Sequence, residues 1–152
     1  MTIEVQGIAG LKELVGKDLG YSDWVEVTQM RVDDFANATG DRQWIHIDPE
    51  RAKRESPFHG PIAHGYLTLS MGPALLPEII DVTGVTMALN YGLDKVRFPA
   101  PVMVGSKLRM GATLDKVEDF EGGAQATMTL TFLCEDAPKP SCVATVIFRY
   151  YA

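Results

Sequence analysis

The sequence has little cysteine, no long hydrophobic run and no excess of positive charge. Its two cysteines, Cys134 and Cys142, are too few for a disulfide framework, and neither belongs to a CxxC pair that could bind a metal. No stretch approaches the roughly 18 consecutive apolar residues of a membrane-spanning helix. The 14 basic and 20 acidic residues give a formal net charge of −6, the opposite balance from a general nucleic-acid or anionic-membrane binder. We therefore expect neither nucleic acid nor membrane as a partner.

The composition is that of an ordinary globular protein. Of the 152 residues, 46% are hydrophobic and 22% are charged, which excludes disordered and collagen-like chains. The length predicts a single domain over residues 1–152. Met1–Gly10 lacks a basic segment followed by an apolar one, so we expect no signal peptide. The expected absence of a signal peptide and the interpretation of both cysteines as small buried hydrophobic residues favour a reducing, cytoplasmic location.

The first third of the chain has helical spacing. Gly10–Lys17 carries apolar residues at helical intervals. Thr28 is a suitable N-cap, and Gly40 a suitable residue after the C-terminus, for a helix of about ten residues. Asp48 and Pro49 open another short helix, because Asp caps the first turn and Pro is favoured at the first helical position.

Gly65–Ile80 is strongly apolar on nearly every side. A helix of this composition is surrounded by protein. Pro73 removes one backbone donor and is expected to bend it.

In the second half of the chain the hydrophobic period changes from 3.6 to 2, which predicts strands. The runs are Val85–Phe98, with a possible kink at Gly92, and Leu108–Leu114, Ala126–Cys134 and Ala144–Tyr150. Short polar segments at Glu121–Gly123 and Asp136–Pro140 read as hairpin connections. One apolar helix followed by antiparallel strands predicts an α+β fold, a sheet curled around the helix, whose edges a dimer would protect.

Three histidines, His46, His59 and His64, fall within 19 residues. Asp41 follows the helix-ending Gly40, and His46 lies five residues further on. A carboxylate and an imidazole that converge in this way could hold one water molecule and transfer its protons. The structural alternative is that Asp41 caps a turn and His46 is a satisfied loop residue.

Pro61–Gly65 leads into the apolar helix. The start of a helix offers unpaired N–H groups and a partial positive charge, and glycine lets a ligand approach the backbone closely. Gly65 could therefore stabilise a carbonyl oxygen that gains negative charge during a reaction. The alternative is an ordinary helix start with a packing glycine.

Together, the Gly-Asp…His-x-Asp motif in Phe35–Ala52 and the Pro-Ile-Ala-His-Gly motif in Gly60–Gly65 resemble the MaoC-like dehydratases, which include the R-specific enoyl-CoA hydratases. Asn90–Pro101, followed by Gly105, is also similar to this family. The resemblance is strongest to the branch with nodulation protein N-like members and single-domain mycobacterial hydratases. It implies an α+β hot-dog fold, an antiparallel sheet wrapped around a long central helix, and a homodimer.

The resemblance also implies an activity, reversible addition of water to trans-2-enoyl thioesters, giving R-3-hydroxyacyl thioesters. The substrate would be an acyl-CoA or acyl-carrier thioester, with no metal and no redox cofactor. The resemblance implies that Asp41 and His46 correspond to the family residues that bind the catalytic water. It also implies that the N–H of Gly65 corresponds to the group that polarises the thioester carbonyl. We expect the following residues to contact substrate: Gln43, Trp44, His64, Tyr66, Ser70 and Asn90.

The sequence departs from the family pattern at two places. Gln43–Ile45 stands where many hydratases have Asn-Pro-Leu, which could reshape the acyl pocket. Some relatives have a supporting serine nine residues after the histidine that corresponds to His64, and that position is Pro73 here, with Ser70 as a possible substitute. His59 is assigned no role, and His64 could instead brace its turn.

Three other functions remain open from the sequence. A hot-dog thioesterase would carry a carboxylate on or near the central helix, but Tyr66–Pro77 has none and Glu78 comes late. A dehydratase of a different acyl or hydroxy-acid thioester would use the same two side chains. A non-catalytic acyl-binding module would keep the fold without requiring both Asp41 and His46.

Overall fold

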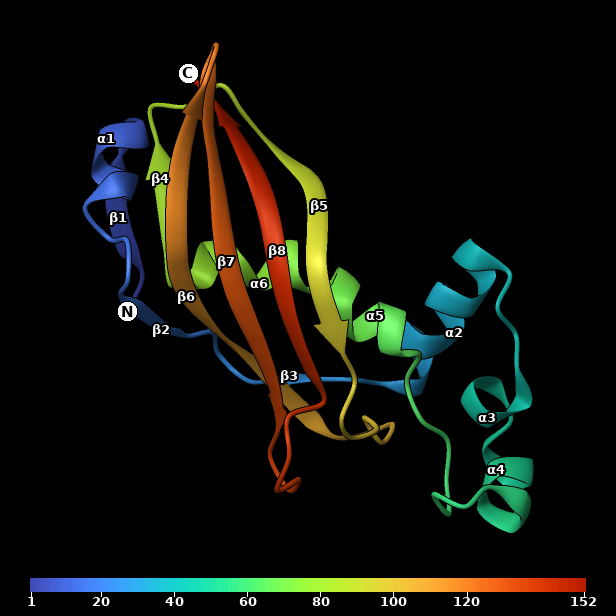
Figure 1. Ribbon diagram of the computed structural model, residues 1–152. Coiled ribbons are helices and arrows are strands. Elements are labelled where there is room, and N and C mark those ends of the chain that lie inside the picture. Colours follow the sequence, from blue (N-terminus) through green and yellow to red (C-terminus); the bar gives the residue numbers. More distant parts are fainter.

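A computed structural model describes residues 1–152 of the protein. One curved antiparallel sheet forms its body (Figure 1). The strands follow the order β2 (Asp18–Tyr21), β6 (Lys107–Phe120), β7 (Gly123–Cys134), β8 (Cys142–Tyr151) and β5 (Met87–Arg97), and the short β3 (Val25–Glu26) also pairs with β6. The long strands and hairpins predicted in the second half are therefore confirmed. The register shifts near Gly92, where a kink was expected.

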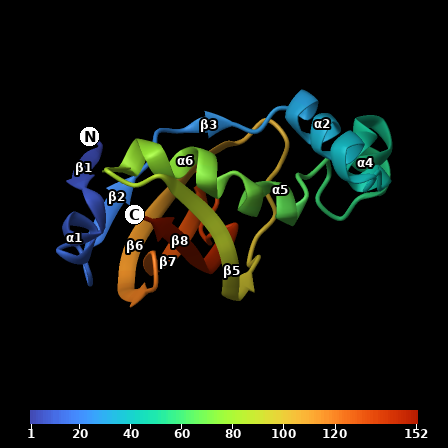
Figure 2. The same cartoon turned by 90° about the horizontal axis from the view of Figure 1, so that it is seen from above.

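The helices fall into two groups. α5 (Gly65–Ser70) and α6 (Gly72–Ile79) follow each other across one face of the sheet, while α2 (Gln29–Thr39), α3 (Trp44–Ile47) and α4 (Pro49–Glu55) lie beyond its end (Figure 2). At the opposite end, α1 (Gly7–Lys12) lies beside a parallel pair formed by β1 (Ile3–Gln6) and β4 (Ile80–Thr83). None of these helices has the length and apolar character needed to cross a membrane.

The core lies between the sheet and α6. Alternate residues of β8, of most of β7 and of the first half of β6 are buried, which explains the period of 2 in these strands. Leu108, Met110 and Leu114 of β6 are fully buried there, as is Phe132 of β7. Burying one such side chain contributes about 1.5–3 kcal/mol, so this layer holds the helices on the sheet.

The long central helix is interrupted. The sequence predicts one bent helix, Gly65–Ile80, but the structure has two short ones that meet at Met71. Pro73 lies in the first turn of α6, where its missing N–H has no intrahelical partner to lose. Gly72 packs closely against β7, since an added Cβ would lie 3.2 Å from Leu130 Cδ1. Pro73 thus starts a new helix instead of bending a continuous one.

The predicted caps of α2 and α4 are confirmed. The Thr28 side chain accepts a hydrogen bond from the N–H of Arg31, and Gly40 ends α2 in the left-handed conformation with φ of 87°. The Asp48 side chain accepts from the N–H of Arg51. The first helix differs from the prediction: it covers Gly7–Lys12, and the residues after it form a turn.

Both cysteines are free and buried, as expected. Burial raises the pKa of Cys142 to about 11, so its thiol is protonated and unreactive at neutral pH.

We call α2, α3 and α4 together, residues 29–55, the helical arm. Its helices contact chiefly one another, and backbone hydrogen bonds link it to the body. Ile62 donates its N–H to the carbonyl of Ile45 on the arm at 3.0 Å, and Ala63 donates to the carbonyl of Val102 at 2.8 Å. The segment before α5 therefore joins the arm to the body.

Candidate active site

Asp41 lies at the turn between α2 and α3. Its Oδ1 accepts a hydrogen bond from the N–H of Gln43 at 3.4 Å, so the carboxylate caps the turn. Its Oδ2 lies 4.0 Å from Nε2 of His64, and the side chain is 56% exposed. One oxygen is used in the turn, and the other faces the histidines and solvent.

His46 lies in α3 and is buried, with only 6% of its surface exposed. Its Nδ1 lies 2.7 Å from the carbonyl oxygen of Ile62. Because a carbonyl oxygen can only accept, Nδ1 carries the proton and Nε2 the lone pair. Gln29 also donates its side-chain amide to the carbonyl of His46 at 2.8 Å, which fixes the backbone.

Burial lowers the pKa of His46 below its ordinary value, and the neighbouring His64 acts in the same direction. The Ile62 carbonyl and the Asp41 carboxylate oppose this shift without reversing it. His46 is therefore neutral at pH 7, and its Nε2 can accept a proton.

His64 precedes α5 and packs against both residues. Its Nε2 donates to the backbone carbonyl of Asp41 at 2.9 Å. Its ring is stacked on that of His46, with centroids 3.9 Å apart, and Phe35 of α2 packs on it at 4.9 Å.

Gly65 is the first residue of α5, and no acceptor in the protein takes its N–H. The Phe98 ring closes over it, since an added Cβ would lie 3.1 Å from two ring carbons. Because α5 has only six residues, its dipole is weaker than that of the long helix expected from the sequence. The exposed amide itself is the main feature of this site.

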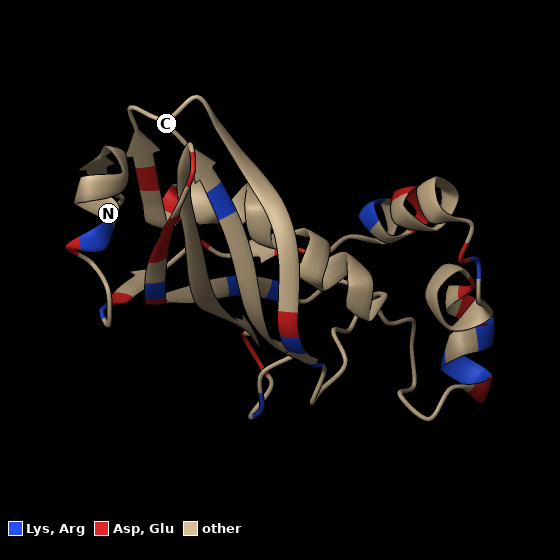
Figure 3. Ribbon diagram, turned by 45° about the horizontal axis from the view of Figure 1, so that its top comes forward, with Lys and Arg blue, Asp and Glu red and all other residues tan.

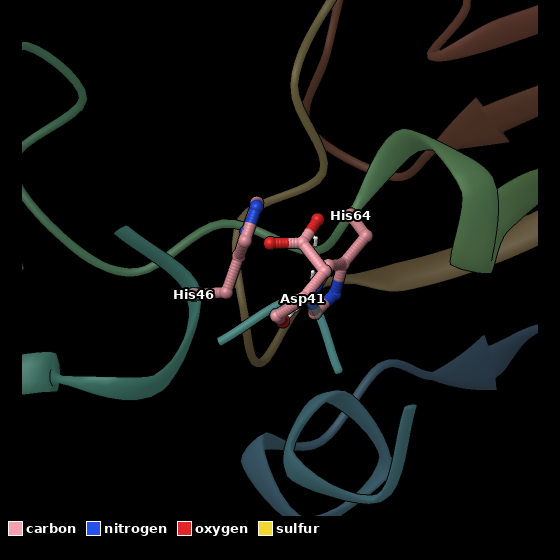
Figure 4. Close-up of side chains that lie close together, drawn as sticks. All are labelled: Asp41, His46 and His64. Carbon is pink, nitrogen blue, oxygen red and sulfur yellow. Dashed lines mark hydrogen bonds and ion pairs between the residues drawn. The ribbon is translucent and has the colours of Figure 1, made fainter. Parts of the chain in front are cut away.

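These groups surround one open pocket of about 230 Å³, lined by Asp41, His46, His64, Gly65, Tyr66 and Phe98. Potential ligand atoms of Asp41, His46 and His64 all lie within 4.8 Å of one another. Figure 4 shows the Asp41 side chain together with the two imidazoles. The structure thus brings Asp41, His46 and Gly65 together, and their catalytic roles are taken up below as proposals.

The other predicted substrate contacts lie in three places. Tyr66 lines the pocket and is 71% exposed. Gln43 and Trp44 lie at the start of α3 and do not line it; the guanidinium of Arg51 covers the Trp44 ring at 4.3 Å.

Ser70 and Asn90 line a separate, mostly apolar cavity of about 320 Å³ beside Pro73. The Ser70 hydroxyl donates to the carbonyl of Tyr66 at 2.6 Å. The hydroxyl is thus bonded to a carbonyl one helical turn earlier, and the role of Ser70 as a substitute for the supporting serine stays a prediction.

Two contributors to the site were not predicted. The Ile62 carbonyl fixes the tautomer of His46, and a backbone group of this kind leaves no side-chain signal in a sequence. Phe98 was part of the family-like stretch but received no role, because only the fold places it over Gly65.

The cluster of Asp41, His46 and His64 has the spacing at which a divalent cation could be held. The Nε2 of His64 is already committed to the Asp41 carbonyl. The sequence predicts neither a metal nor a redox cofactor, and this stays a prediction.

Comparison with known proteins gives a consistent result. A family model described as "MaoC like domain" matches residues 11–132. 3-Hydroxyacyl-thioester dehydratase Z of Mycobacterium tuberculosis is 51% identical over 148 residues, covering 97% of both chains. Nodulation protein N of Rhizobium leguminosarum bv. viciae is 42% identical over 146 residues, covering 92% of this chain and 88% of that protein.

Among solved structures, the R-hydratase PhaJ1 from Pseudomonas aeruginosa superposes with a TM-score of 0.75 at 21% identity, covering 95% of this chain and 85% of that one. At this identity the likeness bears on the fold alone, and it confirms the predicted α+β hot-dog fold.

Proposed function

Because the chain belongs to the MaoC-like domain family and is a hydro-lyase, we propose that it adds water reversibly to trans-2-enoyl-CoA thioesters, giving R-3-hydroxyacyl-CoA thioesters. The name of the mycobacterial relative supports this class of substrate. The observation that carries the proposal is the meeting of three complementary groups at one pocket: the Asp41 carboxylate, the free Nε2 of His46 and the unpaired N–H of Gly65.

Asp41 and His46 hold the reacting water. The water donates one hydrogen bond to the carboxylate and the other to Nε2 of His46. Because His46 is neutral, Nε2 takes a proton as the water oxygen bonds to the β-carbon of the enoyl group. Nδ1 keeps its bond to the Ile62 carbonyl throughout, so the ring does not rotate.

Gly65 stabilises the charge that this addition creates. The electrons of the double bond move toward the thioester, whose carbonyl oxygen gains enolate character. An unpaired amide aimed at that oxygen stabilises the developing charge more than the neutral substrate. The proton held on His46 then returns to the α-carbon, so water has been added and the site restored. Dehydration follows the same steps in reverse.

We assign Ser70 and Asn90 to the acyl chain instead of the reacting atoms. The cavity that they line is walled mainly by apolar residues of the helices and strands, which suits a hydrocarbon chain. Tyr66 and His64, by contrast, lie beside the water-binding groups.

A thioesterase is a poorer fit. Neither α5 nor the first turn and a half of α6 carries a carboxylate. Glu78 lies near the end of α6, and its Oε1 accepts a hydrogen bond from the N–H of Asp23 at 3.1 Å. That carboxylate is therefore engaged elsewhere in the fold.

The test is to incubate the protein with crotonyl-CoA and longer enoyl-CoAs, following enoyl absorbance and free thiol together. We expect absorbance to fall without thiol release, and chiral analysis of the product to give the R alcohol. Thiol release would identify a thioesterase, and no change in either signal would leave a binding module. Both results would contradict the proposal.

We further propose that the protein is a homodimer formed through β5. This strand ends the sheet, pairs only with β8, and carries charge only near its end, at Asp94, Lys95 and Arg97 (Figure 3). Four large apolar side chains are 43–52% exposed along it: Met87, Leu89, Tyr91 and Leu93. A long apolar edge strand invites pairing, and a second copy would cover it.

The double variant Leu89→Asp/Leu93→Asp is expected to be monomeric, because four buried charges would oppose association of two edges. Light scattering should give a mass near 16.7 kDa for the variant and twice that for the wild type. Met30→Asp is the control, since Met30 is 74% exposed on α2, away from the edge. A monomeric wild type, or a variant that remains dimeric, would disprove the proposed interface.

A further inference from the structure

We infer that His64 is a positioning residue that fixes the positions of Asp41 and His46 relative to each other and to Gly65. The inference rests on the proposed function. It assigns to His64 a role in assembling the site, in place of the substrate contact expected from the sequence.

His64 fixes the backbone of Asp41. The Nε2–H of His64 donates to the Asp41 carbonyl at 2.9 Å, across 23 residues of sequence. His64 directly precedes Gly65, so one side chain connects the carboxylate segment of the arm with the amide at the start of α5. Displacing this bond would move the carboxylate relative to the amide.

His64 also supports the imidazole of His46. The two rings are stacked at 3.9 Å with an angle of 25° between their planes, and Phe35 packs on His64 at 4.9 Å. The Ile62 carbonyl holds His46 at Nδ1. The stack prevents the ring from tilting about that bond, so Nε2 keeps its direction.

The chemistry of His64 argues against a purely structural role. Its side chain is 3% exposed, and its Nδ1 is buried without a hydrogen-bond partner. A buried polar atom without a partner is unfavourable, and an apolar ring would fill the same space without that cost. Packing alone therefore does not account for a histidine at this position.

The proximity of the two rings also affects the charge of His46. The titratable groups that face His46 are His64, from the start of α5, and Asp41, from the end of α2. His64 lowers the pKa of His46, and Asp41 raises it. Removing His64 is thus expected to raise the pKa of His46, and to move the acidic limb of the rate profile to higher pH.

Two variants distinguish the contribution of the stacked His64 ring from that of its hydrogen bond to Asp41. His64→Phe keeps a stacked ring but has no donor for the Asp41 carbonyl. His64→Gln keeps an amide that can reach the position of Nε2, but has no ring. The matched control is His59→Asn, since His59 is exposed and has φ of 61°, a conformation that asparagine tolerates.

We expect His64→Phe to fold, because it loses the unpaired Nδ1 together with the hydrogen bond to Asp41. It should lose about 10- to 100-fold in kcat, with little change in KM, because misplacement by about an ångström is costly. His64→Gln should recover part of that loss. In both variants the acidic limb of kcat/KM should move to higher pH, and His59→Asn should match the wild type. Imidazole NMR, with only three histidines to assign, measures the pKa of His46 without substrate.

A His64→Phe protein with wild-type kcat, and with the pKa of His46 unchanged by NMR, would overturn the inference. That result is distinct from failure of the proposed function, in which the wild type itself would convert no enoyl thioester. In that case the NMR measurement still decides whether His64 acts on His46.

Discussion

Replacing Asp41 by Asn or His46 by Gln is expected to lower kcat by about 10²- to 10⁴-fold, the usual contribution of a positioned acid or base. Asn keeps the oxygen that accepts from the N–H of Gln43, so the turn is preserved while the charge is lost. Gln fills much of the volume of His46 but has no nitrogen that can take a proton at neutral pH.

The two substitutions should also be strongly non-additive. Because the two side chains act on one water molecule, the double variant should be little worse than the poorer single variant. Hydration of crotonyl-CoA measures the rates, and circular dichroism checks the fold. The control is Asp34→Asn, an exposed acid on the same arm that should keep the wild-type rate. Near-normal rates in both single variants would exclude this pair as the water-binding site.

Deleting the N–H of Gly65 is expected to reduce kcat by about 10²- to 10³-fold, the typical loss for one donor to a developing oxyanion. Proline is suited to this deletion. It is favoured at the first position of a helix, and His64 already has the extended conformation (φ −60°, ψ 136°) that a residue before proline requires. Gly65→Pro therefore removes one amide hydrogen and leaves α5 intact.

The Phe98 ring complicates this variant, because any added Cβ lies 3.1 Å from it. Comparing Gly65→Pro/Phe98→Ala with Gly65→Ala/Phe98→Ala controls for the added Cβ and for the loss of the ring. Both double variants gain a Cβ, but only the first also replaces the amide hydrogen with the Cδ of the proline ring. If the two double variants turned over enoyl-CoA at equal rates, the amide would have no part in stabilising the transition state.

The sequence predicted the parts of the fold that a local pattern determines. Buried and more exposed residues alternate along β8, most of β7 and the first half of β6. Thr28, Gly40 and Asp48 mark helix ends by their own hydrogen bonds or conformations. The parallel pair of β1 and β4 was missed, because Ile3–Gln6 is short and Ile80–Thr83 directly continues an apolar helix. Those strands depend on a partner far away in the sequence, which no local pattern reveals.

The candidate site, too, was predicted only in part from the sequence. Asp41, His46 and Gly65 could be named from their residue types and from their positions next to helix ends. The groups that orient them could not, because the carbonyls of Ile62 and Asp41 are backbone atoms whose role depends on how two segments meet. His64 was considered a substrate contact or a brace, and the structure gives it contacts suited to a brace.

The helical arm has a consequence for how the protein would lose activity on warming. Asp41 and His46 lie on the arm, whereas Gly65 belongs to the body. The two are joined by a few hydrogen bonds, by the contacts of His64 with His46 and Phe35, and by Val32 of α2, which belongs to the core. Segments with few buried apolar contacts open at lower free-energy cost than core strands. Heat inactivation would therefore report the detachment of the arm, at temperatures where the sheet remains folded.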